Sequence, residues 1–135
     1  MTMTQKQQVS TSPILVITKD SGLLRALYRI LGDSGNQLRS VEKVGRGAKK
    51  IINEINPKLI IVDIMMPLMR GVSIAMRIHE WSSARTVLLT SWRTEDDSLR
   101  RLDITSATGL SDPIKPEDLA EWITGIIKKQ NSEIS

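Results

Sequence analysis

The stretch Leu59-Ile60-Ile61-Val62-Asp63-Ile64-Met65-Met66-Pro67 indicates the fold most clearly. Four apolar residues in a row, followed by a carboxylate and a turn that ends in proline, predict a strand buried on both faces. Strands of this kind belong to parallel α/β sheets, whose sites lie at the carboxyl ends of the strands. Asp63 ends this strand, so it is the first candidate for a functional residue.

The composition indicates one compact domain. The chain has 135 residues, of which 40% are hydrophobic, and this is enough to bury a single core. The absence of cysteine excludes disulfides and thiolate metal sites and favours a reducing compartment, so we expect a cytoplasmic protein. No apolar run approaches the roughly 18 residues that a membrane span needs.

The distribution of charge and the composition of the two chain ends give further expectations. The net charge is +4, but the basic residues are dispersed among acids, so we expect neither membrane binding nor direct nucleic-acid binding by this domain. Residues 1–12 are polar and lack the apolar core of a signal peptide, which predicts a disordered tail. Residues 13–129 form the expected domain, and residues 130–135 a C-terminal tail or the start of a linker.

Strand and helix patterns alternate along the chain, which predicts a parallel sheet covered on both sides. The expected strands are Pro13–Ile17, Leu38–Val44, the run that ends at Asp63, Thr86–Thr90 and a short one at Ala107–Leu110. The expected helices are Asp20–Gly32, Ala48–Ile55, Val72–Trp81, Thr94–Leu102 and Pro116–Lys129. The fourth helix is expected because Thr94-Glu95-Asp96-Asp97 is close to a capping box.

This layout resembles the receiver domain of two-component response regulators, over nearly the whole chain. Four segments carry the match: the first strand, the Asp63 signature with Gly71, Leu88-Leu89-Thr90, and Ser111-Asp112-Pro113 at the place of the family's Lys-Pro. The resemblance implies an α/β fold, a doubly wound five-stranded parallel sheet with five helices, which is the flavodoxin-like receiver fold.

The resemblance also implies a phosphorylation site. In an active receiver, an aspartate accepts a phosphoryl group, two acids after the first strand help to hold Mg²⁺, and a hydroxyl and a lysine bind the phosphoryl oxygens. By the match, Asp63 is the phosphoacceptor, Met65 offers its backbone carbonyl to the metal, and Thr90 is the hydroxyl.

Several other positions depart from the family pattern. Thr18 and Lys19 stand where the acidic pair is expected, and Asp112 stands where a lysine precedes Pro113. The position of the aromatic switch residue falls on Gly109. Two unit charges about 4 Å apart interact by about 4 kcal/mol at an effective dielectric of 20, so Lys19 turns attraction for Mg²⁺ into repulsion. We therefore expect no metal and no other cofactor, with Mg²⁺ bound only if the site is an active receiver site.

The charge changes suggest a pocket locked in one state. Lys19 could pair with Asp63, with Asp112 or with both, and take the metal's place; alternatively, Lys19 points to solvent and Asp112 caps the next turn. Asp20 is interpreted as the cap of the first helix, with a surviving metal ligand as the alternative. Trp92 either fills the space beside Gly109 or is an exposed contact residue.

A possible interaction face is the one that the family commonly uses for pairing, formed by the fourth helix, the fifth strand and the fifth helix. Mixed charges on it could make reciprocal ion pairs across a two-fold axis, or could simply be solvated. Its residues are Trp92, Arg93, Asp96, Asp97, Arg100, Arg101, Glu117, Asp118, Glu121 and Lys128.

The sequence thus favours an atypical receiver domain in signal transduction and transcription regulation. We expect a module that is not an enzyme, does not depend on phosphorylation and acts by protein interaction as a homodimer, with a histidine kinase or a DNA-binding output domain as further partners. The first alternative is a working receiver, phosphorylated on Asp63 by a histidine kinase. The second is a flavodoxin-like flavin enzyme, which is disfavoured because no glycine-rich or Ser/Thr-rich phosphate loop follows the first strand.

Overall fold

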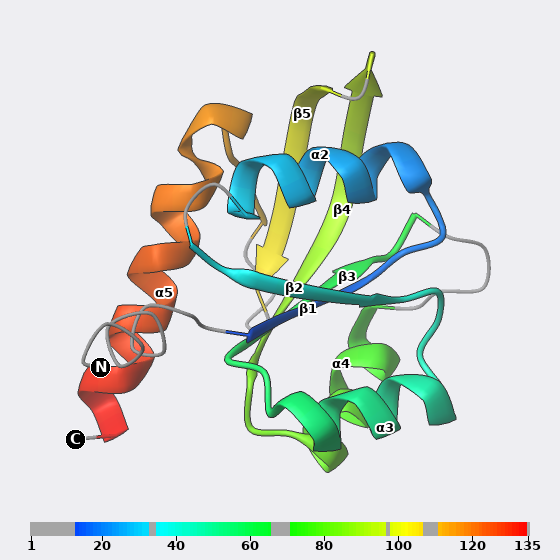
Figure 1. Ribbon diagram of the computed structural model, residues 1–135, viewed down its shortest axis with the longest axis vertical. Coiled ribbons are helices and arrows are strands. Elements are labelled where there is room, and N and C mark those ends of the chain that lie inside the picture. The colour runs from blue at the N-terminus through cyan, green and yellow to red at the C-terminus, as the bar shows by residue number, and fades with distance from the viewer. Residues whose placement is uncertain (1–12, 33–34, 66–70, 97, 107–110, 135) are drawn as a thin grey trace, which may run out of the picture.

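A computed structural model describes residues 13–32, 35–65, 71–96, 98–106 and 111–134 (Figure 1). Its strands are β1 (Pro13–Ile17), β2 (Gln37–Val41), β3 (Leu59–Asp63), β4 (Arg85–Glu95), β5 (Ser98–Ser106) and β6 (Ser111–Pro113). Its helices are α2 (Ser21–Gly32), α3 (Arg46–Ile55), α4 (Gly71–Trp81), the 3-10 turn η1 (Pro116–Asp118) and α5 (Leu119–Ile134). The predicted N-terminal tail, the predicted strand at residues 107–110 and Asp97 lie outside the described residues.

The strands form one six-stranded sheet in the order β2-β1-β3-β4-β5-β6. β1 pairs in parallel with β2 and β3, and β3 pairs in parallel with β4. β4 with β5, and β5 with β6, are antiparallel. The doubly wound α/β fold predicted from the sequence is therefore confirmed, while its last strands run antiparallel to their neighbours.

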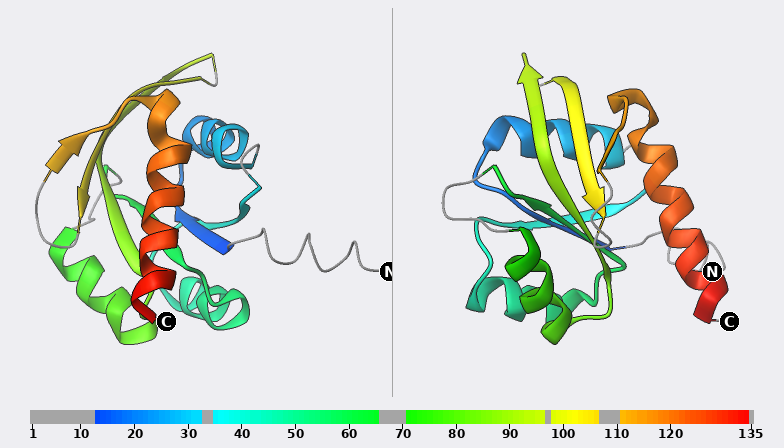
Figure 2. Two further views of the ribbon diagram at one scale, coloured as in Figure 1. Left: turned by 90° about the vertical axis from the view of Figure 1, so that its left-hand side faces the viewer. Right: turned by 180° about the vertical axis from the view of Figure 1, so that it is seen from behind.

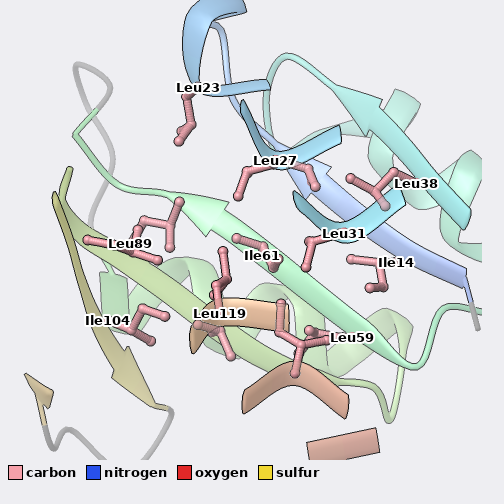
Figure 3. Close-up of a cluster of buried hydrophobic side chains, with 14 of the residues drawn as sticks. Ile14, Leu23, Leu27, Leu31, Leu38, Leu59, Ile61, Leu89, Ile104 and Leu119 are labelled. Carbon is pink, nitrogen blue, oxygen red and sulfur yellow. The ribbon is translucent and has the colours of Figure 1, made fainter. Parts of the chain in front are cut away.

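Helices cover both faces of the sheet (Figures 1 and 2). The apolar side chains of the strands alternate between these two faces. On β1, Ile14 and Val16 pack on the side of α2 and α5, while Leu15 and Ile17 pack on the side of α3 and α4. We call these sides the α2–α5 face and the α3–α4 face. Figure 3 shows part of the core on the α2–α5 face. These central strands are apolar on both faces because both faces are buried.

The predicted helix over Thr94–Leu102 is wrong. The described residues of this segment, 94–96 and 98–102, form the tip of an antiparallel hairpin in which Glu95 lies opposite Ser98, and Asp96 has a left-handed φ of 51°. The hairpin tip extends beyond the rest of the sheet (Figure 2). Its inner side packs into the core of the α2–α5 face through Leu99, Leu102 and Ile104.

Two bulges set the direction of the side chains in the hairpin. The register skips Thr90 on β4 and Arg100 on β5. Successive strand residues point to opposite faces, so one skipped residue moves every later side chain to the other face. Trp92 therefore lies on the same face as Leu89, three residues before it, and opposite Leu102. The bulge at Thr90 is what turns Trp92 toward the α2–α5 face.

The C-terminal helix also differs from the prediction in its bounds. Pro116 begins η1, and α5 continues to Ile134, beyond the predicted end at Lys129. Leu119, Ile123 and Ile127 of α5 are buried against the sheet. No helix within the described ranges is long and apolar enough to cross a membrane.

Candidate functional site

Asp63 lies at the carboxyl edge of the sheet and is almost completely buried. It is the last residue of β3, pairs in register with Leu89 of β4, and is 1% exposed. Alternation from Leu59 and Ile61, which point into the core of the α2–α5 face, places the Asp63 side chain on that same face. The strand therefore places a carboxylate in the crevice where α/β folds have their binding sites.

Both carboxylate oxygens of Asp63 accept hydrogen bonds from the protein. Thr18 Oγ1 donates to Oδ2 over 2.8 Å. The backbone N–H of Met65 and the indole Nε1–H of Trp92 donate to Oδ1 over 2.9 Å and 3.0 Å. A hydrogen bond to a charged group contributes about 1.5–3 kcal/mol, and a buried carboxylate without such donors is very costly. These three donors account for the burial of Asp63.

Thr18 is a buried link between Asp63 and the start of α2. The residue is 3% exposed, and its hydroxyl oxygen accepts the backbone N–H of Asp20 over 3.1 Å while the hydroxyl donates to Asp63. Because the oxygen accepts from Asp20, the proton of the hydroxyl is free to point at the carboxylate. Thr18 therefore supplies a neutral donor at the position where the family pattern has an acid.

Lys19 and Asp20 are exposed, and neither bonds to Asp63. Asp20 Oδ1 accepts the backbone N–H of Leu23 over 2.8 Å, as expected for the cap of α2. The hypothesised ion pair between Lys19 and Asp63 is absent from the structure, since no salt bridge joins them. Among the described residues, three neutral donors stabilise the Asp63 carboxylate, and the ammonium group of Lys19 is not one of its partners.

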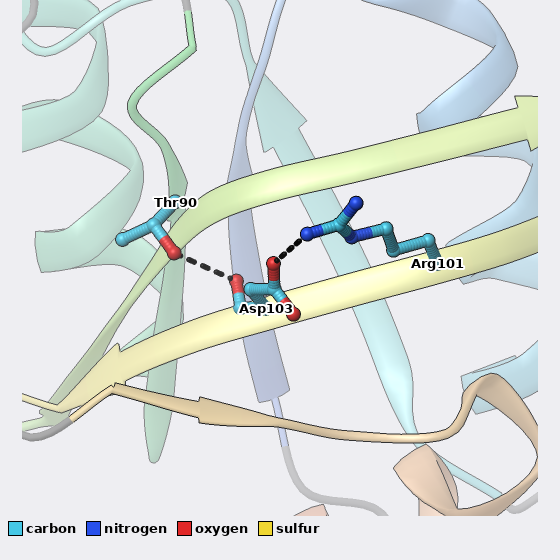
Figure 4. Close-up of polar contacts among 3 residues, drawn as sticks. All are labelled: Thr90, Arg101 and Asp103. Carbon is cyan, nitrogen blue, oxygen red and sulfur yellow. Dashed lines mark hydrogen bonds and ion pairs between the residues drawn. The ribbon is translucent and has the colours of Figure 1, made fainter.

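Thr90 does not point at Asp63. Its hydroxyl donates to the backbone carbonyl of Asp103 on β5 over 3.3 Å, across the bulge (Figure 4). The Asp103 carboxylate accepts a hydrogen bond from Arg101 over 3.0 Å. The hydroxyl expected to bind a phosphoryl group is therefore used to hold β4 to β5.

An open pocket of about 280 Å³ lies over the site. Its lining residues are Lys19, Asp20, Asp63, Met65 and Trp92. Trp92 is half-buried, with its ring packed against the core of the α2–α5 face. Sequence reasoning singled out Trp92 but missed its bond to Asp63, because that bond depends on the bulge at Thr90. Gly109 lies outside the described residues, as do the side chains of Asp112 and Pro113, so their predicted roles stay predictions.

The residues of the predicted interaction face are divided between the hairpin and the C-terminal segment. Trp92 belongs to the Asp63 site, and the predicted fourth helix is replaced by strands, so the face is not built as expected. Arg93 Nη2 and Arg100 Nε each lie 3.9 Å from Glu95 Oε2. All three side chains are solvent-exposed, so these ion pairs are weak. The other described members are also exposed: Asp96, Arg101, Glu117, Asp118, Glu121 and Lys128.

Comparison with known proteins identifies the family. The family model described as "Response regulator receiver domain" matches residues 14–124, and the chain belongs to this family. The chain is 24% identical over 120 residues to the DNA-binding response regulator MtrA of Mycolicibacterium paratuberculosis, covering 89% of this chain and 53% of that protein. It is 34% identical over 76 residues to the uncharacterized transcriptional regulatory protein YclJ of Bacillus subtilis, covering 56% of this chain and 34% of that one.

The fold is shared with solved structures as well. The anti-anti-sigma factor PhyR of Bartonella quintana superposes with a TM-score of 0.60 at 14% identity, covering 97% of this chain and 55% of that one. The chain spans about half the length of the curated relatives it matches. It is thus a response regulator receiver domain, of the kind found in two-component signalling and in transcriptional regulators.

The Mg²⁺ of this family does not fit the residues present. Mg²⁺ prefers an oxygen-rich site, but only two carboxylates line this pocket, and both oxygens of Asp63 already accept protein donors. Asp20 is engaged in capping α2, and Thr18 turns its proton toward Asp63. Among the described residues, no group of three or more His, Cys, Asp or Glu side chains could hold a metal ion.

Proposed function

We propose that this receiver domain transmits its signal without phosphorylation of Asp63. One observation carries the proposal: both oxygens of the Asp63 carboxylate accept hydrogen bonds. The donors are Thr18 after β1, Met65 after β3 and Trp92 on β4. The side chain then serves as an acceptor that ties three strands together at the carboxyl edge of the sheet.

The chemistry of phosphoryl transfer supports this proposal. The transferred group carries negative charge on its oxygens, and catalysis depends on positioning and on cations that stabilise this charge. Attack by Asp63 would have to use the lone pair of Oδ2 that Thr18 leaves, in a side chain that is only 1% exposed, and any donor displaced by the incoming group would cost about 1.5–3 kcal/mol. The metal that offsets such costs in the family has no suitable ligand set on the described side chains.

The proposed activity is protein interaction, with no catalytic turnover of its own. We place the domain in the cytosol as the regulatory part of a transcriptional response regulator, whose output is a DNA-binding segment or partner. The relatives named as DNA-binding or transcriptional regulators support this assignment. A histidine kinase partner belongs to the alternative in which Asp63 accepts phosphate.

The proposed contact is a homodimer through the hairpin and the start of α5. The hairpin carries Arg93, Arg100 and Arg101, while η1 and the first turn of α5 carry Glu117, Asp118 and Glu121. β5 packs against η1, so the acidic group lies beside the β5 edge of the sheet, whereas Arg93 and Arg101 point away from α5, opposite in direction to their neighbours Trp92 and Leu102. A two-fold axis parallel to this edge, in the plane of the sheet, turns one copy over relative to the other and so sets the basic group of each copy against the acidic group of the other.

Sedimentation of the domain with and without phosphoramidate and Mg²⁺ tests this proposal. We expect twice the chain mass of 15.1 kDa under both conditions, and the same result for Asp63→Asn. Arg101→Glu should shift the equilibrium toward the monomer because it places an acid against the acidic group. A dimer that forms only with the phosphoryl donor would contradict phosphorylation independence, and a monomer under every condition would contradict the homodimer.

A further inference from the structure

The segment from Thr94 to Leu102 carries two conflicting structural patterns. Its sequence begins with a threonine followed by three acids, which is typical of a helix N-terminus, and Leu99 and Leu102 have helical spacing. In the structure the described residues of this segment, 94–96 and 98–102, form the tip of the β4–β5 hairpin. A strong local preference that disagrees with the fold indicates that contacts elsewhere select the observed conformation.

Within the hairpin, local interactions give limited support. The register skips Arg100, and Asp96 adopts a left-handed φ of 51°, a conformation that is uncommon outside glycine but that aspartate tolerates better than most residues. The ion pairs of Glu95 are 3.9 Å long and exposed. Leu99 and Leu102 share one side in the hairpin only because of the skipped residue, and they would also share one side of a helix. Burial of the two leucines therefore does not distinguish the two conformations.

The hydrogen bond from Trp92 to Asp63 distinguishes the hairpin from the helix. The parallel pairing of β4 with β3 ends at Leu89, opposite Asp63, and beyond it β4 has β5 as its strand partner. The hydrogen bond from Trp92 Nε1 to Asp63 Oδ1 ties this extension back to β3. It fixes the backbone of β4 as a strand, in register with Leu102, immediately before the segment with helical character begins.

We propose that Trp92 is a positioning residue whose hydrogen bond to Asp63 selects the hairpin over a helix at Thr94–Leu102. The segment is then a two-state element, and the side chains of Asp63 and Trp92 together set its state. A change that removes the acceptor or the donor releases the tip of the hairpin. The surface that carries Arg93, Arg100 and Arg101 is then rearranged without any phosphoryl transfer.

Backbone NMR of Trp92→Phe tests the proposal, because phenylalanine keeps an aromatic ring and removes only the N–H donor. In the wild type, we expect strand-type Cα shifts at residues 94–102 and cross-strand contacts between Thr94 and Leu99. In Trp92→Phe, the Cα shifts should move toward helical values and that contact should be lost, since the helical population rises by about tenfold or more. Trp81→Phe is the matched control, because Trp81 packs on the α3–α4 face and should leave the segment unchanged.

A pair of substitutions at Asp63 keeps the test decisive if Trp92→Phe fails to fold. Asp63→Asn keeps an Oδ1 acceptor for the indole and should retain the hairpin, whereas Asp63→Leu has none and should shift the segment toward the helix. Strand-type shifts in every folded variant, or a helix in the wild type, would overturn the proposal. The proposal rests on the same Asp63 contacts as the proposed function, but the NMR readout reports backbone conformation and is independent of phosphorylation.

Discussion

Replacing Asp63 with alanine is expected to lower the free energy of unfolding by about 3 kcal/mol. The substitution removes one acceptor and leaves three donors, from Thr18, Met65 and Trp92, without their partner. A buried donor without a partner costs about 1–3 kcal/mol, and water can reach part of this site because Met65 is 51% exposed. The total is therefore smaller than the sum of three separate penalties. Urea unfolding followed by circular dichroism measures the change.

Asp63→Asn is the matched control for this substitution. The amide oxygen still accepts from Met65 and Trp92, so we expect a loss of less than about 1 kcal/mol. A rise in the free energy of unfolding for Asp63→Ala would contradict the account. In a pocket of crowded carboxylates, removal of one acid relieves repulsion and stabilises the fold. A gain in stability would therefore indicate such a pocket, and a loss would indicate the donor site described above.

Replacing Thr18 with aspartate has the second large expected effect. The substitution changes a donor into a second carboxylate next to Asp63, because Thr18 Oγ1 is 2.8 Å from Oδ2. Two like charges about 4 Å apart repel by about 4 kcal/mol at an effective dielectric of 20, and proton uptake by the pair limits this cost. We expect a fall of about 3 kcal/mol in unfolding free energy without metal, with much of it recovered in millimolar Mg²⁺.

Thr18→Asn separates charge from shape in this experiment. Asparagine has the size of aspartate and can donate to Asp63 through its amide, so it should cost less than about 1 kcal/mol and should not respond to Mg²⁺. Thermal unfolding of both variants, with and without Mg²⁺, provides the comparison. Equal stability of the two variants without metal would show that no negative charge at Asp63 faces residue 18.

The parallel half of the fold could be predicted from the sequence because its signals are local. The apolar runs before Ile17 and Asp63 are typical of strands buried on both faces, and both strands form as predicted. The predicted end of the second helix at Ile55 is also confirmed, since Asn56 adopts a left-handed φ of 47° and Pro57 follows it before β3. The placement of Asp63 at the carboxyl edge of the sheet follows directly from these elements.

The hairpin and the role of Trp92 could not be predicted in this way. The hairpin depends on a register that skips Arg100, and its connection contains Asp96-Asp97 instead of the Asn-Gly or Asp-Gly sequences typical of tight turns. The contact between Trp92 and Asp63 joins residues 29 positions apart and depends on a second bulge. Such long-range pairings leave no periodic signal in the sequence.

The position of Lys19 shows the limit of reasoning from charge alone. The sequence left two positions open for its ammonium group: beside Asp63, Asp112 or both in place of the metal, or pointing to solvent. In the structure Lys19 is exposed, and three neutral donors satisfy the carboxylate. Neutral donors suffice because a hydrogen bond to a charged group already offsets much of the cost of burying it.

Intact mass of the domain after incubation with phosphoramidate, with and without Mg²⁺, tests the central claim most directly. The account predicts an unchanged mass under conditions that label an ordinary receiver in the same experiment, since both Asp63 oxygens are engaged by protein donors. A Mg²⁺-dependent phosphoryl adduct that is absent from Asp63→Asn would contradict it, because Asp63 would then act as an acceptor despite its three hydrogen bonds.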